Sequence, residues 1–361
     1  MSSSYGKIFK IALFGESHSA GIGVVIDGVP SGVELDMDEI MFEMSRRAPG
    51  KNDFSTPRNE NDIPEILSGV FDGKTTGTPI CAIIRNTNTI SKDYNPEILR
   101  PSHADYTGNV RYNGFNDYRG GGHFSGRLTA PIVFAGAIAK QIIKKHNVKI
   151  YSHIKNIGSV YDSEINMTMP DVDILKELRN ETLPFINEES KEKAKSEILF
   201  AREKGDSVGG SIEAVICGVK AGVGSPFFDS VESRISSLLF SIPAVKSVEF
   251  GIGKAFSEMY GSGANDSFYT DGEKIYTKTN NNGGINGGIT NGMPIVLTVG
   301  IKPTPSIAKE QETVNIATKE NITAKISGRH DPCIVQRAVP VIEAALAIAL
   351  LDMYLEAKVY A

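Results

Sequence analysis

The chain has 361 residues and a hydrophobic share of 40%, enough for a sizeable core, which excludes a disordered protein. Its formal net charge of −5 argues against a nucleic-acid-binding protein, which would usually be basic. We expect no membrane segment either, because the longest apolar stretch, 338–351, contains Glu343 and is too short to span a bilayer.

The hydrophobic pattern predicts strands in adjacent pairs and long helices that follow them. In chain order we expect a hairpin (7–14 and 22–29), a helix (36–46), a strand (80–85) and a long helix (127–145). A polar helical region (160–205), two strands (211–219 and 294–301) and a long, mostly apolar helix (334–357) follow. This order favours an α+β fold over a doubly wound parallel sheet.

A weak internal repeat predicts two related halves, roughly 7–145 and 200–358, packed as one domain over 1–361. Gly15-Glu-Ser leads to Gly32-Val33, and 190 residues later Gly205-Asp-Ser leads to Gly222-Val223. Likewise, Arg119-x7-Arg127 before a helix recurs as Arg329-x7-Arg337 before another helix. A ligand bound between two such halves would meet arginines from both.

Loops rich in glycine, arginine and histidine are the strongest functional signal. The arginines concentrate in three short segments, 46–58, 100–127 and 329–337, and in an acidic protein this indicates a focused anion site. The richest loop is Tyr118–Arg127, in which three consecutive glycines precede a helix. Free backbone N–H groups at a helix N-terminus bind phosphate, and the flanking arginines can add bidentate contacts.

The histidines divide into two groups. His146 and His153 lie in a Lys-rich helix end and a strand-like stretch and are interpreted as structural. The other four lie within the Arg- and Gly-rich loops: His18, His103, His123 and His330. Because no convergent His, Cys and carboxylate spacing is present, we predict no metal site, and acid–base chemistry or anion contact instead.

Several other motifs leave two interpretations open. Arg46-Arg47 could bind an anion or only complement the C-terminus of a helix. Asp331 could cap the last helix or act as a base kept ionised by neighbouring cations. The three cysteines lack a C-x-x-C spacing and no signal peptide is visible at the N-terminus, so we expect reduced thiols and a cytoplasmic location.

Seven stretches together resemble the signature of the chorismate synthase family. They occur in the family's order and cover essentially the whole chain, at residues 15–18, 27–32, 46–50, 100–106, 117–122, 302–306 and 328–333. The resemblance implies a β-α-β sandwich with long helices between antiparallel sheets, assembled as a homotetramer. It also implies a 1,4-elimination of phosphate from 5-enolpyruvylshikimate 3-phosphate, giving chorismate. The reaction implied needs reduced FMN but has no net redox change, and NADPH is a possible external reductant.

The resemblance also implies roles for individual residues. His18 would supply a proton near the departing phosphate, His103 would lie beside the flavin N1 side, and Asp331 would manage the flavin N5 proton. Ser17 and Ser125 would be hydrogen-bond partners. The substrate or NADP would be bound by Arg46, Arg47, Arg127 and Arg337. FMN would be bound by His123, Phe124, Ser125, Pro243, Ala244, Gly287, Lys302, Pro303, Thr304, Pro305, Ser306 and Arg329.

Two positions depart from the family pattern. His123-Phe124 stands where many relatives have Arg-Ser, and Asp53 stands near a family arginine, with Lys51 as the nearest cation. Two alternatives also stay open at this stage. One is an FMN oxidoreductase acting on a phosphorylated substrate, and the other is a non-enzymatic sensor of a phosphorylated metabolite.

Overall fold

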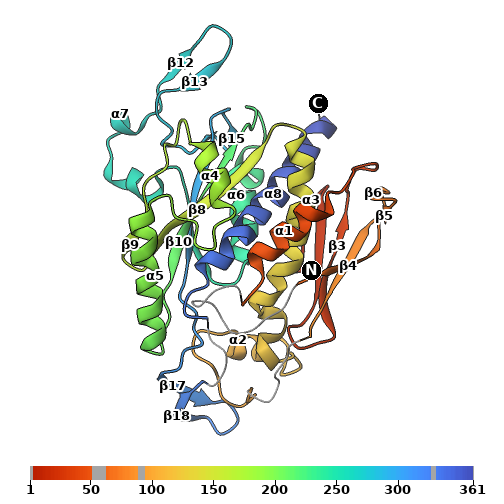
Figure 1. Cartoon of the computed structure of the whole chain (residues 1–361), viewed down its shortest axis with the longest axis vertical. Coiled ribbons are helices and arrows are strands. Elements are labelled where there is room, and N and C mark those ends of the chain that lie inside the picture. Colours follow the sequence, from red (N-terminus) through yellow and green to blue (C-terminus); the bar gives the residue numbers. More distant parts are fainter. Residues whose placement is uncertain (1–2, 51–61, 88–93, 327–330, 361) are drawn as a thin grey trace.

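The computed structural model describes residues 3–50, 62–87, 94–326 and 331–360, and it contains two five-stranded antiparallel sheets (Figure 1). The N-terminal sheet has the order β1 (Ser4–Tyr5), β2 (Lys10–Gly15), β3 (Gly21–Asp27), β7 (Ile80–Arg85) and β4 (Pro64–Ser68). The C-terminal sheet has the order β11 (Val245–Phe250), β16 (Ile295–Ile301), β10 (Gly210–Cys217), β8 (Lys149–Ile157) and β9 (Val160–Tyr161).

The remaining elements are helices, short turns and two-stranded hairpins. The helices are α1 (Met37–Arg47), α2 (Asp105–Arg111), α3 (Thr129–Lys144), α4 (Val172–Leu178), α5 (Glu188–Glu203), α6 (Val231–Ser241), α7 (Gly261–Ala264) and α8 (Val335–Tyr360). Short 3₁₀ turns are η2 (Arg119–Phe124), η3 (Gly126–Leu128), η4 (Phe227–Asp229) and η5 (Gly253–Glu258). The hairpins are β5 (Val70–Phe71) with β6 (Lys74–Thr75), β12 (Phe268–Thr270) with β13 (Ile275–Thr277), β14 (Ile285–Asn286) with β15 (Ile289–Thr290), and β17 (Glu310–Asn315) with β18 (Glu320–Lys325).

A layer of helices fills the space between the sheets. Figure 1 shows α1, α3 and α8 between the N-terminal and the C-terminal strands, and α3 contacts β2, β3 and β7 while α8 contacts β8 and β10. Helices α3 and α8 approach closely because Gly136 has no side chain: a Cβ atom there would lie 2.3 Å from the Cβ of Ala344. Helices α3 and α8 therefore form the centre of the core.

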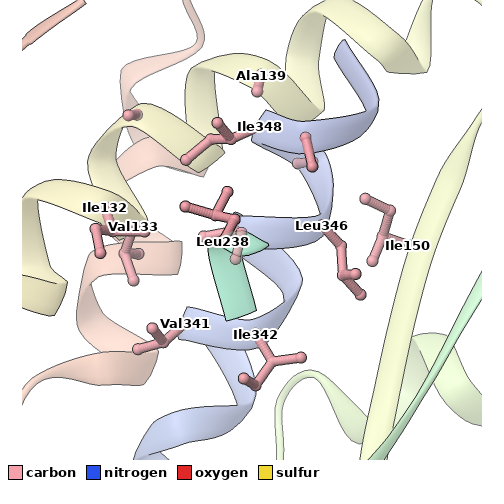
Figure 2. Close-up of a cluster of buried hydrophobic side chains, with 14 of the residues drawn as sticks. Ile132, Val133, Ala139, Ile150, Leu238, Val341, Ile342, Leu346 and Ile348 are labelled. Carbon is pink, nitrogen blue, oxygen red and sulfur yellow. The ribbon is translucent and has the colours of Figure 1, made fainter. Parts of the chain in front are cut away.

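The core side chains come from all of these layers. Figure 2 shows Val341 and Ile348 of α8 pointing toward α3, which carries Ile132, Val133 and Ala139, while Ile342 and Leu346 of α8 point toward the side of Ile150 of β8. Leu238 of α6 belongs to the same cluster. Full burial of an aliphatic side chain of this size contributes about 1.5–3 kcal/mol relative to its exposed state. Removal of this apolar surface from water is thus what holds the helices between the sheets.

Glu343 is the one charged residue inside the apolar stretch of α8, and it is fully buried. Its carboxylate accepts hydrogen bonds from Arg46 (2.6 and 2.9 Å), Lys140 (2.6 Å) and Ser152 (2.7 Å). Burial alone would raise the pKa of Glu343, but Arg46 and Lys140 outweigh burial and lower it. Helix α8 is long and apolar enough to cross a bilayer, yet most of it is buried inside this fold.

The α+β class is confirmed, and most predicted elements lie within a few residues of their expected bounds. The hairpin is β2–β3, the strand over 80–85 is β7, and the three main helices are α1, α3 and α8. Helix α1 begins after Asp36, whose side chain accepts a hydrogen bond from the backbone N–H of Glu39 at 3.0 Å. The polar region over 160–205 contains α4 and α5.

Four strands of each sheet have the same topology, while the edge strand precedes its neighbour in the first sheet (β1 before β2) and follows it in the second (β9 after β8). The order β2, β3, α1, β4, β5–β6, β7, α3 in the first part of the chain corresponds to β8, β10, α6, β11, β14–β15, β16, α8 in the second. Even single hydrogen bonds correspond. Thr75 Oγ1 accepts from Val33 N (2.9 Å) and Thr290 Oγ1 accepts from Val223 N (3.0 Å). By this correspondence the second half begins at β8, with α4 and α5 inserted; the duplication itself stays a prediction.

Candidate active site

A cavity of about 450 Å³ lies where the C-terminus of α1 meets the beginnings of α3 and α8. Loops from both parts of the chain line it, at 94–105, 116–126, 242–244 and 302–306. Most of the predicted site residues line this cavity: Arg47, His103, Phe124, Ser125, Arg127, Pro243, Ala244, Lys302, Thr304, Pro305, Ser306, Asp331 and Arg337. Loops more than 200 residues apart in sequence are therefore brought to one place.

Two buried arginines share one buried carboxylate at the wall of the cavity. Asp62 accepts from Arg47 Nη1 at 2.6 Å and also from Arg127 Nη1. Arg47 donates further to Thr129 Oγ1 (3.1 Å) and to the carbonyl of Gly126 (3.0 Å). Burial would raise the pKa of Asp62, but the charges of Arg47 and Arg127 lower it, so this carboxylate is ionised at neutral pH.

Arg337 extends this cluster from the first turn of α8. Its Nη1 donates to Asp331 Oδ2 at 2.7 Å, and its Nε donates to the backbone carbonyl of Arg47 at 3.2 Å. Burial, with the nearby Arg337 and Arg127, lowers the pKa of Arg47 to about 10 although Asp62 opposes the shift. Within the described ranges, the ion pairs of this cluster join three guanidinium groups to two carboxylates, an arrangement suited to an anionic ligand.

The glycine run of η2 lies against the turn that carries His18. Gly120, Gly121 and Gly122 all have positive φ, at 61°, 84° and 53°, which excludes them from an α-helix. The glycines precede the predicted helix as expected, but α3 begins only at Thr129, so their own N–H groups do not form its first turn. A Cβ atom at Gly120 would lie 2.4 Å from His18 Cδ2, so the absence of a side chain lets the imidazole approach the loop.

Ser17 and His18 stand behind the lining of the cavity. Ser17 is buried, and its hydroxyl donates its proton to the carbonyls of Arg119 (3.2 Å) and Gly120 (2.9 Å). It therefore fixes the glycine loop. His18 contacts Gly120 and the ring of Tyr94, with ring centroids 5.3 Å apart at 89°. Both of these neighbours line the cavity.

His103 has a defined tautomer. Its Nδ1 lies 3.1 Å from the carbonyl of Pro101, which can only accept, so Nδ1 carries the proton. Its Nε2 is then the acceptor for Ser306 Oγ at 2.9 Å. Burial and the nearby charge of Arg100 lower the pKa of His103 to about 4, so the imidazole is neutral near pH 7 in the free protein.

The loop over 302–306 presents polar groups beside an apolar wall. Lys302 Nζ donates to the carbonyl of Ser102 at 2.9 Å, and burial lowers its pKa. Thr304 Oγ1 is buried and has no hydrogen-bond partner within the described ranges. The apolar wall is formed by Ile242, Pro243, Ala244, Ile334, Ala338 and Val341, and Phe124 lies at the side. Such a site suits a planar ring with a polar, anionic tail.

Other predicted residues lie outside the lining. The Nδ1 of His123 donates to the carbonyl of Gly15 at 2.8 Å, and its Nε2 lies 3.0 Å from the hydroxyl oxygen of Ser3. His123 therefore joins the glycine loop to the N-terminal sheet. Arg46 is held by Glu343 and Glu43 beside a second, smaller cavity. Pro303 is exposed, and Gly287 lies in the β14–β15 turn. Arg329, like His330 and Arg58, lies outside the described residues.

Sequence reasoning missed the residues that hold this site together. Asp62 and Asn86 follow no recognisable motif, yet both contact Arg127. Arg100, noticed only within its motif, is paired with Asp105 (2.7 Å) and lies over the ring of Tyr94 at 5.3 Å. Of these residues, only Asp105 could have been noticed from the sequence, because it is the first residue of α2, where acidic side chains are favoured.

Comparison with known proteins places this fold and site in context. Residues 9–355 match the chorismate synthase family. The chain is 44% identical over 359 residues to a chorismate synthase from Thermococcus kodakarensis, with 98% of each chain covered. It is 45% identical to one from Pyrococcus abyssi, again with 98% of each covered. A crystal structure of a chorismate synthase superposes with a TM-score of 0.78 at 31% identity, covering 98% of this chain and 93% of that one.

Proposed function

The chain belongs to the chorismate synthase family, and we propose that it eliminates phosphate from 5-enolpyruvylshikimate 3-phosphate to give chorismate, with reduced FMN bound in the cavity. The resemblance first seen in the seven motifs is thereby confirmed at the level of the family. The proposal concerns the finer points: the cofactor, the residues that act, and the assembly.

The observation that carries the proposal is the cluster of Arg47, Arg127 and Arg337 around one cavity. The substrate carries a phosphate and two carboxylates, and bidentate guanidinium contacts suit both groups. Only Asp62 and Asp331 offset these cations among the carboxylates described above. An excess of positive charge at a largely apolar cavity favours a ligand with several negative charges.

The histidines and Asp331 supply groups that can move protons. His18 lies beside Gly120 at the cavity, and we assign it protonation of the departing phosphate. Asp331, paired with Arg337 at 2.7 Å, would manage the flavin N5 proton that relays the C6 hydrogen. His103 enters the reaction as a neutral imidazole, and an anion bound next to it would raise its pKa.

We propose that the cofactor binds against the side of the cavity formed by residues 242–244 and 302–306. The unpartnered Thr304 Oγ1 together with Lys302 and Ser306 would hold the phosphate end of FMN. Pro243 and Ala244, with Phe124, would contact the ring. When bound, reduced FMN supplies electron density that promotes loss of the phosphate. We keep Ser125, His123, Pro303, Pro305, Gly287 and Arg329 as proposed cofactor contacts, and Arg46 as a proposed NADP or substrate contact.

The assembly completes the proposal. We propose the homotetramer, the cytoplasmic location and the β-α-β sandwich implied by the family, and NADPH as a possible external reductant. The packing of α3 and α8 between two antiparallel sheets supports the sandwich. The chain has an odd number of cysteines, three, and none of them has C-x-x-C spacing. All three are free in this structure, which supports a reducing compartment.

One experiment tests the reaction. The purified protein is mixed with 5-enolpyruvylshikimate 3-phosphate and photoreduced FMN under anaerobic conditions, and phosphate and flavin absorbance are followed together. We expect many phosphates released per flavin, with the flavin still reduced. Stoichiometric flavin oxidation would instead favour the oxidoreductase, and ligand binding without turnover would favour the sensor.

Variants test the assigned roles. His18→Ala and Asp331→Ala should bind both ligands and turn over at least about 100-fold more slowly, the usual range for a lost acid or base. His146→Ala is the matched control, since His146 stacks on Tyr354 outside the cavity lining. A near-normal rate in His18→Ala or Asp331→Ala would remove that residue from the mechanism.

A further inference from the structure

Asn86 joins two parts of the site that the sequence motifs treat separately. It directly follows β7, in the middle of the N-terminal sheet, and lies between the turn that carries His18 and the guanidinium of Arg127. Neither the motifs nor the cavity lining includes it. Its contacts nevertheless reach both groups.

All hydrogen-bonding atoms of the Asn86 side chain are used. Nδ2 donates to the carbonyls of Glu16 and Ser19, each at 2.9 Å. Oδ1 accepts from Arg127 Nε at 3.1 Å. The surroundings fix the orientation of the amide, because carbonyls can only accept and a guanidinium can only donate. A carboxylate at this position could still meet Arg127 but would have no proton for either carbonyl.

The turn that Asn86 holds is the one that places His18. Ser19 Oγ donates to the carbonyls of Glu16 (2.9 Å) and Gly21 (2.8 Å), which closes the turn around His18. The backbone N–H of Asn86 adds a bond to the carbonyl of Ala20 at 3.3 Å. The turn is therefore fixed to the end of β7 at three points around the imidazole.

Arg127 has a different set of supports. Its Nη1 donates to Asp62, its Nη2 to the carbonyl of Arg85 at 3.4 Å, and its Nε to Asn86. Loss of Asn86 would leave the ion pair with Asp62 in place, so the charge of Arg127 would stay at the cavity. The relative position of Arg127 and His18 would change instead.

We propose that Asn86 is a positioning residue for the elimination, which holds the His18 turn at a fixed distance and orientation from the Arg127 guanidinium. The inference rests on the proposed function, since it needs His18 to act on a group that Arg127 binds. A displacement of about 1 Å between reacting groups can cost on the order of 100-fold in rate. An amide that spans both groups removes that freedom.

The test compares Asn86→Ala, Asn86→Asp, His18→Ala and the double variant His18→Ala/Asn86→Ala by steady-state phosphate release. Asn86→Ala should lower kcat by roughly 10- to 100-fold with little change in KM for the substrate. Asn86→Asp should be as slow, because it keeps the acceptor for Arg127 but not the two donors. The double variant should be no slower than His18→Ala, since residues that act as one unit are not additive.

Asn280→Ala is the matched control. Asn280 is a buried amide with the same bonding pattern, since Nδ2 donates to Met167 and Pro294 carbonyls at 2.8 Å and Oδ1 accepts from Gly284 N at 2.8 Å. It lies outside the cavity lining, so its loss should reduce stability but leave kcat unchanged. All rates are measured on protein whose circular dichroism matches that of the wild type.

The possible results distinguish failure of the proposed role of His18 from failure of the proposed role of Asn86. If His18→Ala keeps the wild-type rate, the proposed role of His18 fails and the inference fails with it. If His18→Ala is slow but Asn86→Ala is normal, only the inference fails. Full activity in Asn86→Asp, or multiplicative losses in the double variant, would also overturn it.

Discussion

Removal of the Asp62 carboxylate is the sharpest test of how the arginine cluster is built. Asp62 is fully buried and meets two guanidinium groups that are themselves 4–5% exposed, those of Arg47 and Arg127. Asp62→Ala would leave two buried cations next to each other without their shared partner. Breaking a buried ion pair from one side costs about 3–5 kcal/mol, because the remaining charge stays desolvated.

The pH dependence of this loss has a fixed sign. Because the two arginines outweigh burial and lower the pKa of Asp62 in the folded state, its contribution is present above the unfolded value of about 3.9 and is lost as the pH falls through the folded pKa. The difference between wild type and Asp62→Ala should therefore be constant between about pH 5 and 8 and should shrink only in acid.

Urea unfolding followed by circular dichroism measures the difference. Glu65→Ala is the control only three residues away, because Glu65 pairs with Arg85 at 3.1 Å on the surface, and it should change the unfolding midpoint little. Phosphate added at millimolar concentration should stabilise Asp62→Ala more than wild type, since it would bind the two arginines that have lost the Asp62 carboxylate. A loss below about 1 kcal/mol, no larger than that of an exposed pair, would refute the account of the cluster.

Two further predictions concern the glycine loop and the C-terminal sheet. Gly120→Ala should lower activity at least about tenfold and destabilise the fold by about 1–3 kcal/mol, since its Cβ would meet His18 at 2.4 Å. Gly121→Ala carries similar backbone strain, since Gly121 has φ 84°, but its Cβ would lie 3.8 Å from the nearest atom. It should therefore keep more activity than Gly120→Ala, and equal losses of activity would contradict the steric argument. Burial lowers the pKa of His153, but hydrogen bonds to Asp162 (2.8 Å) and Glu213 (3.2 Å) raise it more. Its contribution to the free energy of unfolding should be full below about pH 6.5 and fall at higher pH, so His153→Gln should match wild type more closely at pH 9 than at pH 6.

The sequence predicts local features of this fold well because they depend on neighbouring residues. The helical periodicity of 127–145 and 334–357 and the cap at Asp36 are enough to find α3, α8 and α1. Arg47, Arg127 and Arg337 were expected to share one ligand, and all three line the cavity. The sequence could not tell Arg46 from Arg47. One helical step of about 100° turns Arg46 toward Glu343 and Arg47 toward Asp62.

The supporting contacts could not be predicted, because they depend on tertiary packing. Nothing near Asp62 or Asn86 in the sequence indicates that they meet an arginine 65 or 41 residues later. The conformation of the glycine run depends on packing for a related reason. Its positive φ values let Gly120 pack against Ser17 and His18, while anion binding by this loop stays a prediction.

The corresponding topology of the two sheets explains where the cavity forms. In both parts a threonine closes the loop after the second strand, since Thr75 donates to Pro30 (2.6 Å) and Thr290 donates to Lys220 (2.6 Å). None of these four residues is part of the lining of the 450 Å³ cavity. The cavity lies instead where α1, α3 and α8 meet, and there the two parts differ: Arg47 and Arg127 come from the first and Arg337 from the second. Two parts of corresponding topology thus contribute different charges to the cavity at the place where their helices meet.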